Sequence, residues 1–237
     1  MTDTTSTALP RTLSPSLFLF TIIYGGMVVL AGVLGTKLAS LGTWPLLGSL
    51  AVESGIFAFL LLVVISSAVA ELYGKRTADR LVRLGFIPLI MSMILLMTVI
   101  HVVPPAVFWH DQESFARILG QGARLQFAGL IAYGVSQTLN VAIFSKLTSS
   151  TNWSGKLLWF RALVAGLLSQ IVDTILFVTI AFYGAIDKVT GQPYPVSQIM
   201  TGQIISKMVL STLMVPIFIY VFVALGRWID RREGQSE

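Results

Sequence analysis

Polar and aromatic side chains recur at helical spacing in two long apolar stretches of the sequence. The residues that follow the i, i+3, i+4, i+7 pattern are Gln137, Asn140 and Phe144 in the first stretch, and Gln170, Asp173, Thr174 and Phe177 in the second. Residues at this spacing lie on one face of a helix. Two facing helices would offer amides, a carboxylate and aromatic rings to one cavity. These groups suit a planar heterocycle, because carboxylates accept from N–H groups, amides donate and accept, and rings stack.

Asp173 is the strongest functional candidate of this set. A carboxylate at the centre of a membrane-spanning helix costs about 3 kcal/mol or more, and hydrogen bonding between helices does not require a charge. The amides of Asn140 and Gln170 have an equally good second interpretation, which is hydrogen bonding across helices at about 1 kcal/mol each. Arg161 lies a few turns before Asp173 and is either its distant counter-charge or a cation that reaches the membrane surface.

Three more charged residues border apolar stretches. Glu71 ends one stretch, where an ion pair with Lys75 four residues later is the simple alternative to a role in a binding site. Lys207 is close enough to the outer end of the last stretch to reach the interface, or to pair with Glu53.

The composition predicts the framework that must hold these side chains. The chain has 237 residues, of which 55% are hydrophobic and 11% are charged, whereas a soluble domain has about a quarter of its residues charged. We therefore predict an all-α, polytopic membrane bundle, with about six helices at roughly 20 residues per span. The expected spans are residues 17–38, 46–70, 84–103, 125–144, 157–183 and 199–225, within a single transmembrane domain, residues 17–226.

The placement of cations predicts the orientation, because Lys and Arg accumulate in cytoplasmic loops. The cations expected on one side are Arg11, Lys75, Arg76, Arg80, Arg83, Lys146, Lys156, Arg227, Arg231 and Arg232. Only Arg117 and Lys188 fall clearly in the opposite loops. Both termini are therefore expected in the cytoplasm, residues 1–16 as a disordered segment and residues 227–237 as a basic tail. The net charge of +5 then reflects membrane topology, so the expected partner is the lipid bilayer and not nucleic acid.

The sequence lacks the motifs of common enzyme and metal sites. Cysteine is absent, which excludes disulfides, thiolate ligands and cysteine nucleophiles. A Walker-type phosphate loop, an HExxH motif and a GxSxG elbow are also missing. His101 and His110 have no metal-ligand partner at helical spacing and are expected at the membrane interface. We expect no catalytic activity, no metal and no cofactor.

Two blocks of sequence carry a resemblance to a known family. They are AELYGKR at 70–76 with LGF at 84–86, and LNVAIFSKL at 139–147, WFR at 159–161, SQ at 169–170 with Asp173, Thr174 and Phe177, and IAFYG at 180–184. The first resembles a motif of the queuosine precursor transporter family, also called the putative vitamin uptake transporter family. The second is similar to the fourth and fifth spans of that family in order and spacing. Together the resemblance covers residues 30–227.

The resemblance implies uptake of deazaguanine precursors of the tRNA nucleoside queuosine across the inner (plasma) membrane. The mechanism that we expect is alternating access. The resemblance also implies that the polar positions of the family fall on Asn140, Gln170, Asp173 and Glu71. Two positions differ from the family, since Ser67 and Gly32 stand where an aspartate and an asparagine are usual. A cavity of different shape could accept a related base such as queuine.

The family also resembles, in fold, the six-helix substrate-binding components of energy-coupling-factor vitamin transporters. The alternative function is therefore a binding component for a vitamin-like heterocycle that needs a separate ATP-driven energising complex. Ala31, Gly35 and Ala39 form a stripe of small residues that could dock such a partner or a second copy of the chain. Packing within the bundle is the simpler interpretation of this stripe.

Overall fold

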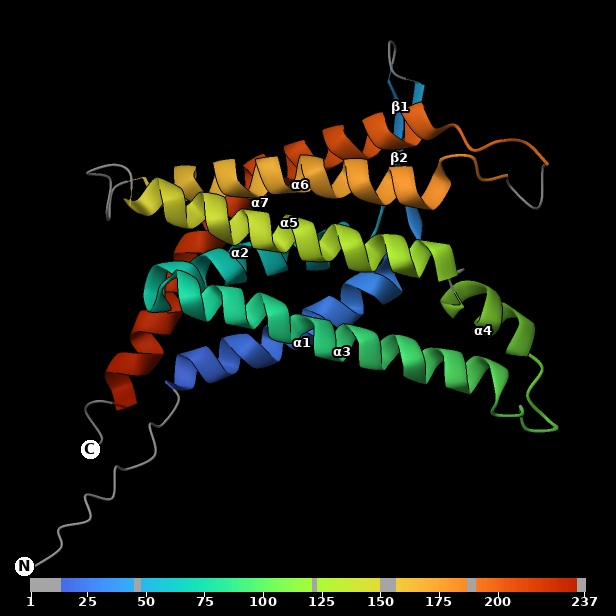
Figure 1. Cartoon of the computed structure of the whole chain (residues 1–237), viewed down its shortest axis with the longest axis horizontal. Helices are drawn as coiled ribbons and strands as arrows, with labels where there is room; N and C mark the ends of the chain where they lie inside the picture. The colour runs from blue at the N-terminus through green and yellow to red at the C-terminus, as the bar shows by residue number, and fades with distance from the viewer. Residues whose placement is uncertain (1–13, 45–47, 121–122, 150–156, 187–190, 234–237) are drawn as a thin grey trace, which may run out of the picture.

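A computed structural model describes residues 14–44, 48–120, 123–149, 157–186 and 191–233. Helices run roughly side by side through most of this part of the chain, and one β-hairpin projects from the bundle (Figure 1). The helices are α1 (Pro15–Leu34), α2 (Ile56–Tyr73), α3 (Lys75–His101), α4 (Gln112–Leu119), α5 (Ala123–Ser149), α6 (Leu158–Phe182) and α7 (Val196–Glu233). The hairpin strands are β1 (Leu38–Trp44) and β2 (Gly48–Glu53).

Six helical segments of the described chain are long and apolar enough to cross a membrane. They correspond to α1, α2, α3, α5 with the short α4 ahead of it, α6 and α7. A helix suits this environment because it satisfies its backbone N–H and C=O groups internally, where no water is available. The predicted all-α bundle with six spans is confirmed. Of the predicted disordered segment, residues 1–13 lie outside the described residues. Of the predicted basic tail, residues 227–233 continue α7 and residues 234–237 lie outside the described residues.

The connection between the first two spans differs from the expected short link. We expected spans at 17–38 and 46–70, but α1 ends at Leu34 and α2 begins at Ile56, with an antiparallel hairpin between them. Glycine, serine and threonine account for nine of residues 35–55, and Gly42 has a φ of +82°. These residues form helices less readily than leucine or alanine. Glu53 is therefore the last residue of a strand and not part of a helix.

The cationic segment that follows α2 is also helical. We expected a loop at 71–83, but α3 begins at Lys75, directly after Gly74. Gly74 has a φ of 81°, a left-handed conformation that glycine adopts without strain, so α2 and α3 join by a single residue. Lys75 pairs with Asp79 on the next turn of α3. The alternative pairing of Lys75 with Glu71 is therefore wrong.

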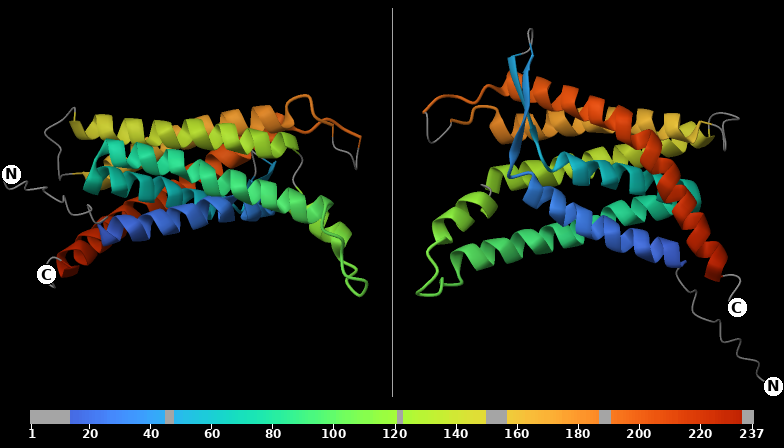
Figure 2. Two further views of the ribbon diagram at one scale, coloured as in Figure 1. Left: turned by 60° about the horizontal axis from the view of Figure 1, so that its bottom comes forward. Right: turned by 180° about the vertical axis from the view of Figure 1, so that it is seen from behind.

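Both ends of the described chain lie at one end of the bundle (Figure 2). Ser14, next to α1, donates a 2.6 Å hydrogen bond to Asp230 near the end of α7. Tyr73, at the end of α2, donates a 2.5 Å hydrogen bond to the same carboxylate. We call this end, defined by Ser14, Tyr73 and Asp230, the terminal end. The opposite end, from which the β1–β2 hairpin extends, is the hairpin end.

Helix α2 is the central element of the bundle. One apolar cluster joins it to α6 and α7, for example through Leu60, Ala162 and Ile219. The other joins it to α1 and α3, through residues such as Ile65 and Phe20. About two thirds of the residues in the apolar segment of α2 are buried, whereas only about a tenth of those in the apolar segment of α3 are buried. The exposed face of α3 is apolar, as contact with lipid requires.

Candidate solute-binding cavity

A cavity of about 180 Å³ lies in the half of the bundle nearer the hairpin end. On this measure one water needs roughly 10–15 Å³, so the cavity has room for a small solute. Its walls come from α1, α2, α3, α5, α6 and α7, and most of the lining side chains are apolar. The lining residues with polar or charged side chains include Glu53, Gln126, Tyr133, Asp173 and Lys207.

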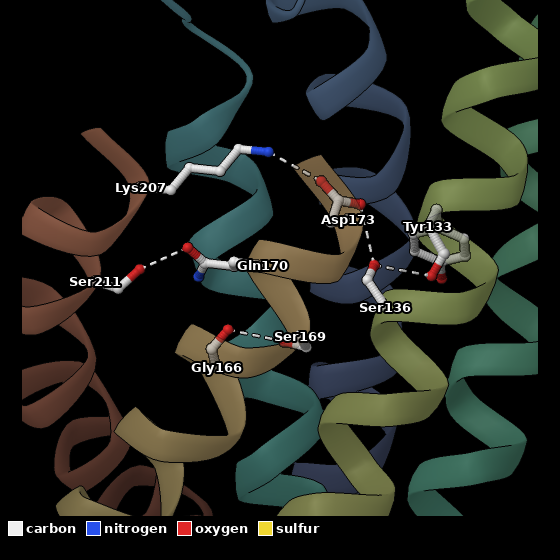
Figure 3. Close-up of polar contacts among 8 residues, drawn as sticks. All are labelled: Tyr133, Ser136, Gly166, Ser169, Gln170, Asp173, Lys207 and Ser211. Atoms are coloured by element: carbon white, nitrogen blue, oxygen red, sulfur yellow. Dashed lines mark hydrogen bonds and ion pairs between the residues drawn. The ribbon is translucent and has the colours of Figure 1, made fainter. Parts of the chain in front are cut away.

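An ion pair between α6 and α7 is the main polar feature of the cavity (Figure 3). Lys207 Nζ lies 2.9 Å from Asp173 Oδ2, and both residues are only 6% exposed. Ser136 on α5 donates a 3.1 Å hydrogen bond to Asp173 Oδ1. Lys207 Nζ also lies 5.5 Å from the ring centroid of Phe59, within the range of a cation–π contact. The counter-charge of Asp173 is therefore Lys207.

Glu53 brings a second carboxylate to the same cavity from the end of β2. A side-chain hydrogen bond joins it to Gln203 on α7. Burial raises the pKa of the Glu53 carboxyl to about 7; the attraction of Lys207 opposes this rise and the repulsion of Asp173 adds to it. The cavity thus combines two carboxylates with one ammonium group.

The predicted amides lie beyond Asp173, toward the terminal end, and do not line the cavity. The residues Gln137, Asn140 and Gln170 are each at most 2% exposed. Asn140 donates a 2.9 Å hydrogen bond to Ser66, and Gln170 accepts a 2.7 Å bond from Ser211. In the described part of the chain, Gln137 Nε2, Asn140 Oδ1 and Gln170 Nε2 nevertheless have no partner. Leaving such a group unpaired in a low-dielectric interior costs about 1–3 kcal/mol.

Glu71, Arg161 and Phe144 form a separate cluster near the terminal end. Arg161, fully buried on the first turn of α6, lies 3.0 Å from Glu71 Oε2 and 2.5 Å from Thr148 Oγ1. Its guanidinium carbon is 5.1 Å from the centroid of the Phe144 ring. Arg161 is twelve residues before Asp173, or about 18 Å along a helix. The structure therefore groups Glu71, Arg161 and Phe144 in a cluster apart from the cavity. Of the site residues predicted from the sequence, only Asp173 and Phe177 line the cavity.

Ser67 and Gly32, the two positions where the resemblance leads us to expect a departure, both border polar features. Asn140 Nδ2 donates a 3.2 Å hydrogen bond to the hydroxyl of Ser67. Gly32 lines the cavity, and a Cβ added there would meet no atom within 4 Å. An aspartate in place of Ser67 would therefore face Asn140, and an asparagine in place of Gly32 would project toward open space in the cavity.

The small-residue stripe makes contacts within the chain. A Cβ on Gly55, just before α2, would lie 2.5 Å from Ala31 O and 3.2 Å from Gly35 Cα. This close approach of backbone to backbone leaves no room for a side chain at position 55. Ala39, the third member of the stripe, is on β1. The contacts of Ala31 and Gly35 favour packing within the bundle.

Sequence reasoning missed part of the polar set on α7. Gln203, Lys207 and Ser211 recur every fourth residue, so they share one face of that helix. They bind Glu53, Asp173 and Gln170, respectively. The periodicity that identified α5 and α6 would have found this face as well. The position of Glu53 could not be found in this way, because it depends on the hairpin.

Six apolar spans around a solute-sized cavity with a buried ion pair define a multi-pass membrane protein with an internal polar site. The chain belongs to the family described as "Putative vitamin uptake transporter", whose family model matches residues 53–221. This match includes all three charged residues of the cavity. It is a transporter family and not an enzyme family, so both the predicted family and the prediction of no enzymatic activity are confirmed.

Two relatives have names that describe a solute. The chain is 32% identical over 114 residues to the "Probable queuosine precursor transporter" of Bacillus subtilis (strain 168), a match that covers 48% of this chain and 49% of the relative. It is 23% identical over 133 residues to the "Queuosine precursor transporter" of Escherichia coli (strain K12), with 56% of each chain covered. The matches thus span about half the length of these relatives. No solved structure matches the chain, so the predicted likeness to energy-coupling-factor components stays a prediction.

Proposed function

We propose that the protein takes up deazaguanine precursors of queuosine across the inner (plasma) membrane. The observation that carries this proposal is the Asp173–Lys207 ion pair in the cavity, next to Phe177. The names of the relatives suggest the solute class. A guanine-like edge has N–H groups that can donate to Asp173 and a carbonyl that can accept from Lys207. Phe177 and the apolar walls would contact the faces of the ring.

The proposed mechanism is alternating access. By the placement of cations, the hairpin end faces outward and the terminal end faces the cytoplasm. The cavity then lies in the outer half, and the Glu71–Arg161 and Tyr73–Asp230 contacts close the inner end. Gln137, Asn140 and Gln170 lie between the cavity and this closed end. Their unpartnered atoms would bind the solute as it moves inward.

The queuosine content of tRNA tests this function. A strain that cannot make the precursor is fed a low concentration of it, with and without this protein. We expect the protein to restore queuosine, and the Asp173→Asn variant to restore much less at equal amounts in the membrane. If the wild-type protein is in the membrane and queuosine is not restored, the solute class is wrong.

Purified protein in liposomes then tests whether accumulation of the solute needs a partner protein. Accumulation without a partner would argue against a binding component that depends on an energising complex.

A further inference from the structure

Three charged side chains face the cavity, and their charges do not balance. Asp173 on α6 and Glu53 on β2 are carboxylates, and Lys207 on α7 is the one ammonium group among the described residues that line the cavity. Lys207 Nζ lies 2.9 Å from Asp173, whereas Glu53 is hydrogen-bonded to the neutral side chain of Gln203. With both carboxylates ionised, the three residues have a net charge of −1.

In the part of the chain that the structure describes, the other groups around Glu53 do not supply the missing positive charge. On the side of α1, Glu53 Oε2 lies 3.9 Å from the position of a Cβ on Gly35, so an uncharged residue faces the carboxylate. Lys37, between α1 and β1, is exposed. Tyr133 lines the cavity from α5, and its hydroxyl is hydrogen-bonded to that of Tyr24. Among the described residues, Asp173 and Lys207 are thus the charges that act on Glu53.

Solute binding would change the environment of Glu53. This residue lies outside the six spans, at the edge of the cavity, and burial raises the pKa of its carboxyl to about 7. A solute displaces water from the cavity and so removes hydration from the ionised carboxylate. Loss of hydration disfavours the charged form of a carboxyl group. The affinity of Glu53 for a proton therefore increases when a neutral solute occupies the cavity.

We infer that Glu53 binds a proton together with the solute, so that a neutral solute enters the cavity with one proton. This inference rests on the solute-binding role proposed above. In the step, a protonated buffer molecule or a hydronium ion in solution loses a proton and its conjugate base stays in solution. The proton bonds to a carboxylate oxygen of Glu53, no bond of the protein breaks, and the net charge of the three residues changes from −1 to zero. A solute with its own primary ammonium group supplies the positive charge itself and takes up no proton.

Calorimetry of the purified full-length chain tests this coupling. A neutral deazaguanine base is titrated at about pH 8 in two buffers with different ionisation enthalpies, which gives the number of protons taken up per solute bound. We expect close to one proton for the wild type and close to none for Glu53→Gln. The matched control is Glu113→Gln, which removes the same charge from an exposed position on α4 and should behave as the wild type. Binding of a deazaguanine that has a primary amine should cause no proton uptake by either protein.

The dependence of affinity on pH gives a second measurement. Above the pKa of Glu53, the affinity of the wild type for the neutral base should fall about tenfold per pH unit, since one proton is bound with each solute. The affinity of Glu53→Gln should not change over this range. Binding by the wild type without proton uptake, or proton uptake that persists in Glu53→Gln, would overturn the inference.

The failure of the proposed solute can be recognised separately. If neither wild type nor variant binds a deazaguanine base, the proposed function is wrong as to solute. Infrared difference spectroscopy of the solute-free protein between mildly acidic and mildly alkaline pH then tests the proton site directly. A carboxylic acid signal that titrates near neutral pH and is lost in Glu53→Gln would support it. If the wild type shows no such signal, Glu53 is not the proton-binding site.

Discussion

Lys207 and Asp173, on neighbouring helices α7 and α6, form a buried ion pair with 2.9 Å between Nζ and Oδ2. Placing one charge in an apolar bundle is unfavourable, and placing an opposite charge beside it recovers part of that cost. The pair also lies in the wall of the cavity. A solute that donates hydrogen bonds to Asp173 must therefore compete with Lys207 or share the carboxylate with it.

Replacing one partner of this pair should reduce stability as well as uptake. In Lys207→Met the Asp173 carboxylate stays buried without its counter-charge, at a cost of about 3–5 kcal/mol. For a chain of this size that corresponds to a fall in Tm of roughly 10 °C. The double variant Asp173→Asn, Lys207→Met should recover most of the Tm but not the uptake. A single variant as stable as the wild type would contradict the assigned pair.

Replacing Glu71 should separate solute binding from transport. Glu71 contacts Arg161 near the terminal end, outside the cavity. We expect Glu71→Gln to bind the solute with an affinity within about threefold of the wild type, while the rate of uptake changes much more. Equilibrium binding in detergent and uptake in cells measure the two quantities. A large loss of affinity in Glu71→Gln would mean that this residue contacts the solute.

The stability of the chain should depend on pH through Glu53. Burial raises the pKa of this carboxyl from 4.5 to about 7, so between these values the folded chain binds more protons than the unfolded chain. The contribution of Glu53 to the free energy of unfolding is therefore fully present below about pH 4.5 and is lost as the pH rises through about 7. We expect Tm to fall between acidic and mildly alkaline pH by more in the wild type than in Glu53→Gln. Equal profiles for the two proteins would rule out a raised pKa.

A cysteine at position 129 should report access to the cavity. The natural chain has no cysteine, and a Cβ on Gly129, which lines the cavity, would meet no atom within 4 Å. We expect Gly129→Cys to react with a membrane-impermeant thiol reagent added outside intact cells, and the solute to slow the reaction. Labelling only from the cytoplasmic side would show that the hairpin end faces the cytoplasm and that the predicted orientation is wrong.

Placing an asparagine at position 32, the residue that the resemblance leads us to expect there, should change solute preference. Position 32 lines the cavity, so the Gly32→Asn variant would add an amide to its wall. We expect little change in Tm and a change of severalfold or more in the relative affinities of deazaguanine bases, because one further polar group is available for hydrogen bonding. Competition binding with two bases checks this, and Gly26→Asn, outside the cavity lining and with similar space, is the control. Unchanged relative affinities would show that position 32 does not contact the solute.

The number of spans, and the place of Asp173 in the wall of an internal cavity, could be predicted from the sequence for physical reasons. Membrane thickness fixes the length of an apolar helix, and a carboxylate in such a helix is too costly to be incidental. The β1–β2 hairpin was missed because its leucines and alanines extend the hydrophobic signal of the adjacent helices. Without the hairpin, the position of Glu53 relative to Asp173 was not predictable.

The grouping of the site residues was predictable only in part. Helical periodicity correctly placed Asn140 beside Gln137 and Gln170 beside Asp173, because neighbours on one helix face follow from geometry alone. Periodicity does not give the rotation or the depth of one helix against another. The partners of Arg161 and Lys207 depend on those quantities, so the Glu71–Arg161 and Asp173–Lys207 pairs emerged only from the packed structure.

The end of α2 has a consequence for how the terminal end can open. Glu71 and Tyr73 are two residues apart, so they point to nearly opposite sides of this helix, where one contacts Arg161 of α6 and the other Asp230 of α7. A displacement of the α2 end must strain both contacts at the same time. In the proposed alternating-access cycle, opening of this end is therefore expected to be cooperative, with both contacts broken together, and a single concerted step limits the leakage of ions through the bundle.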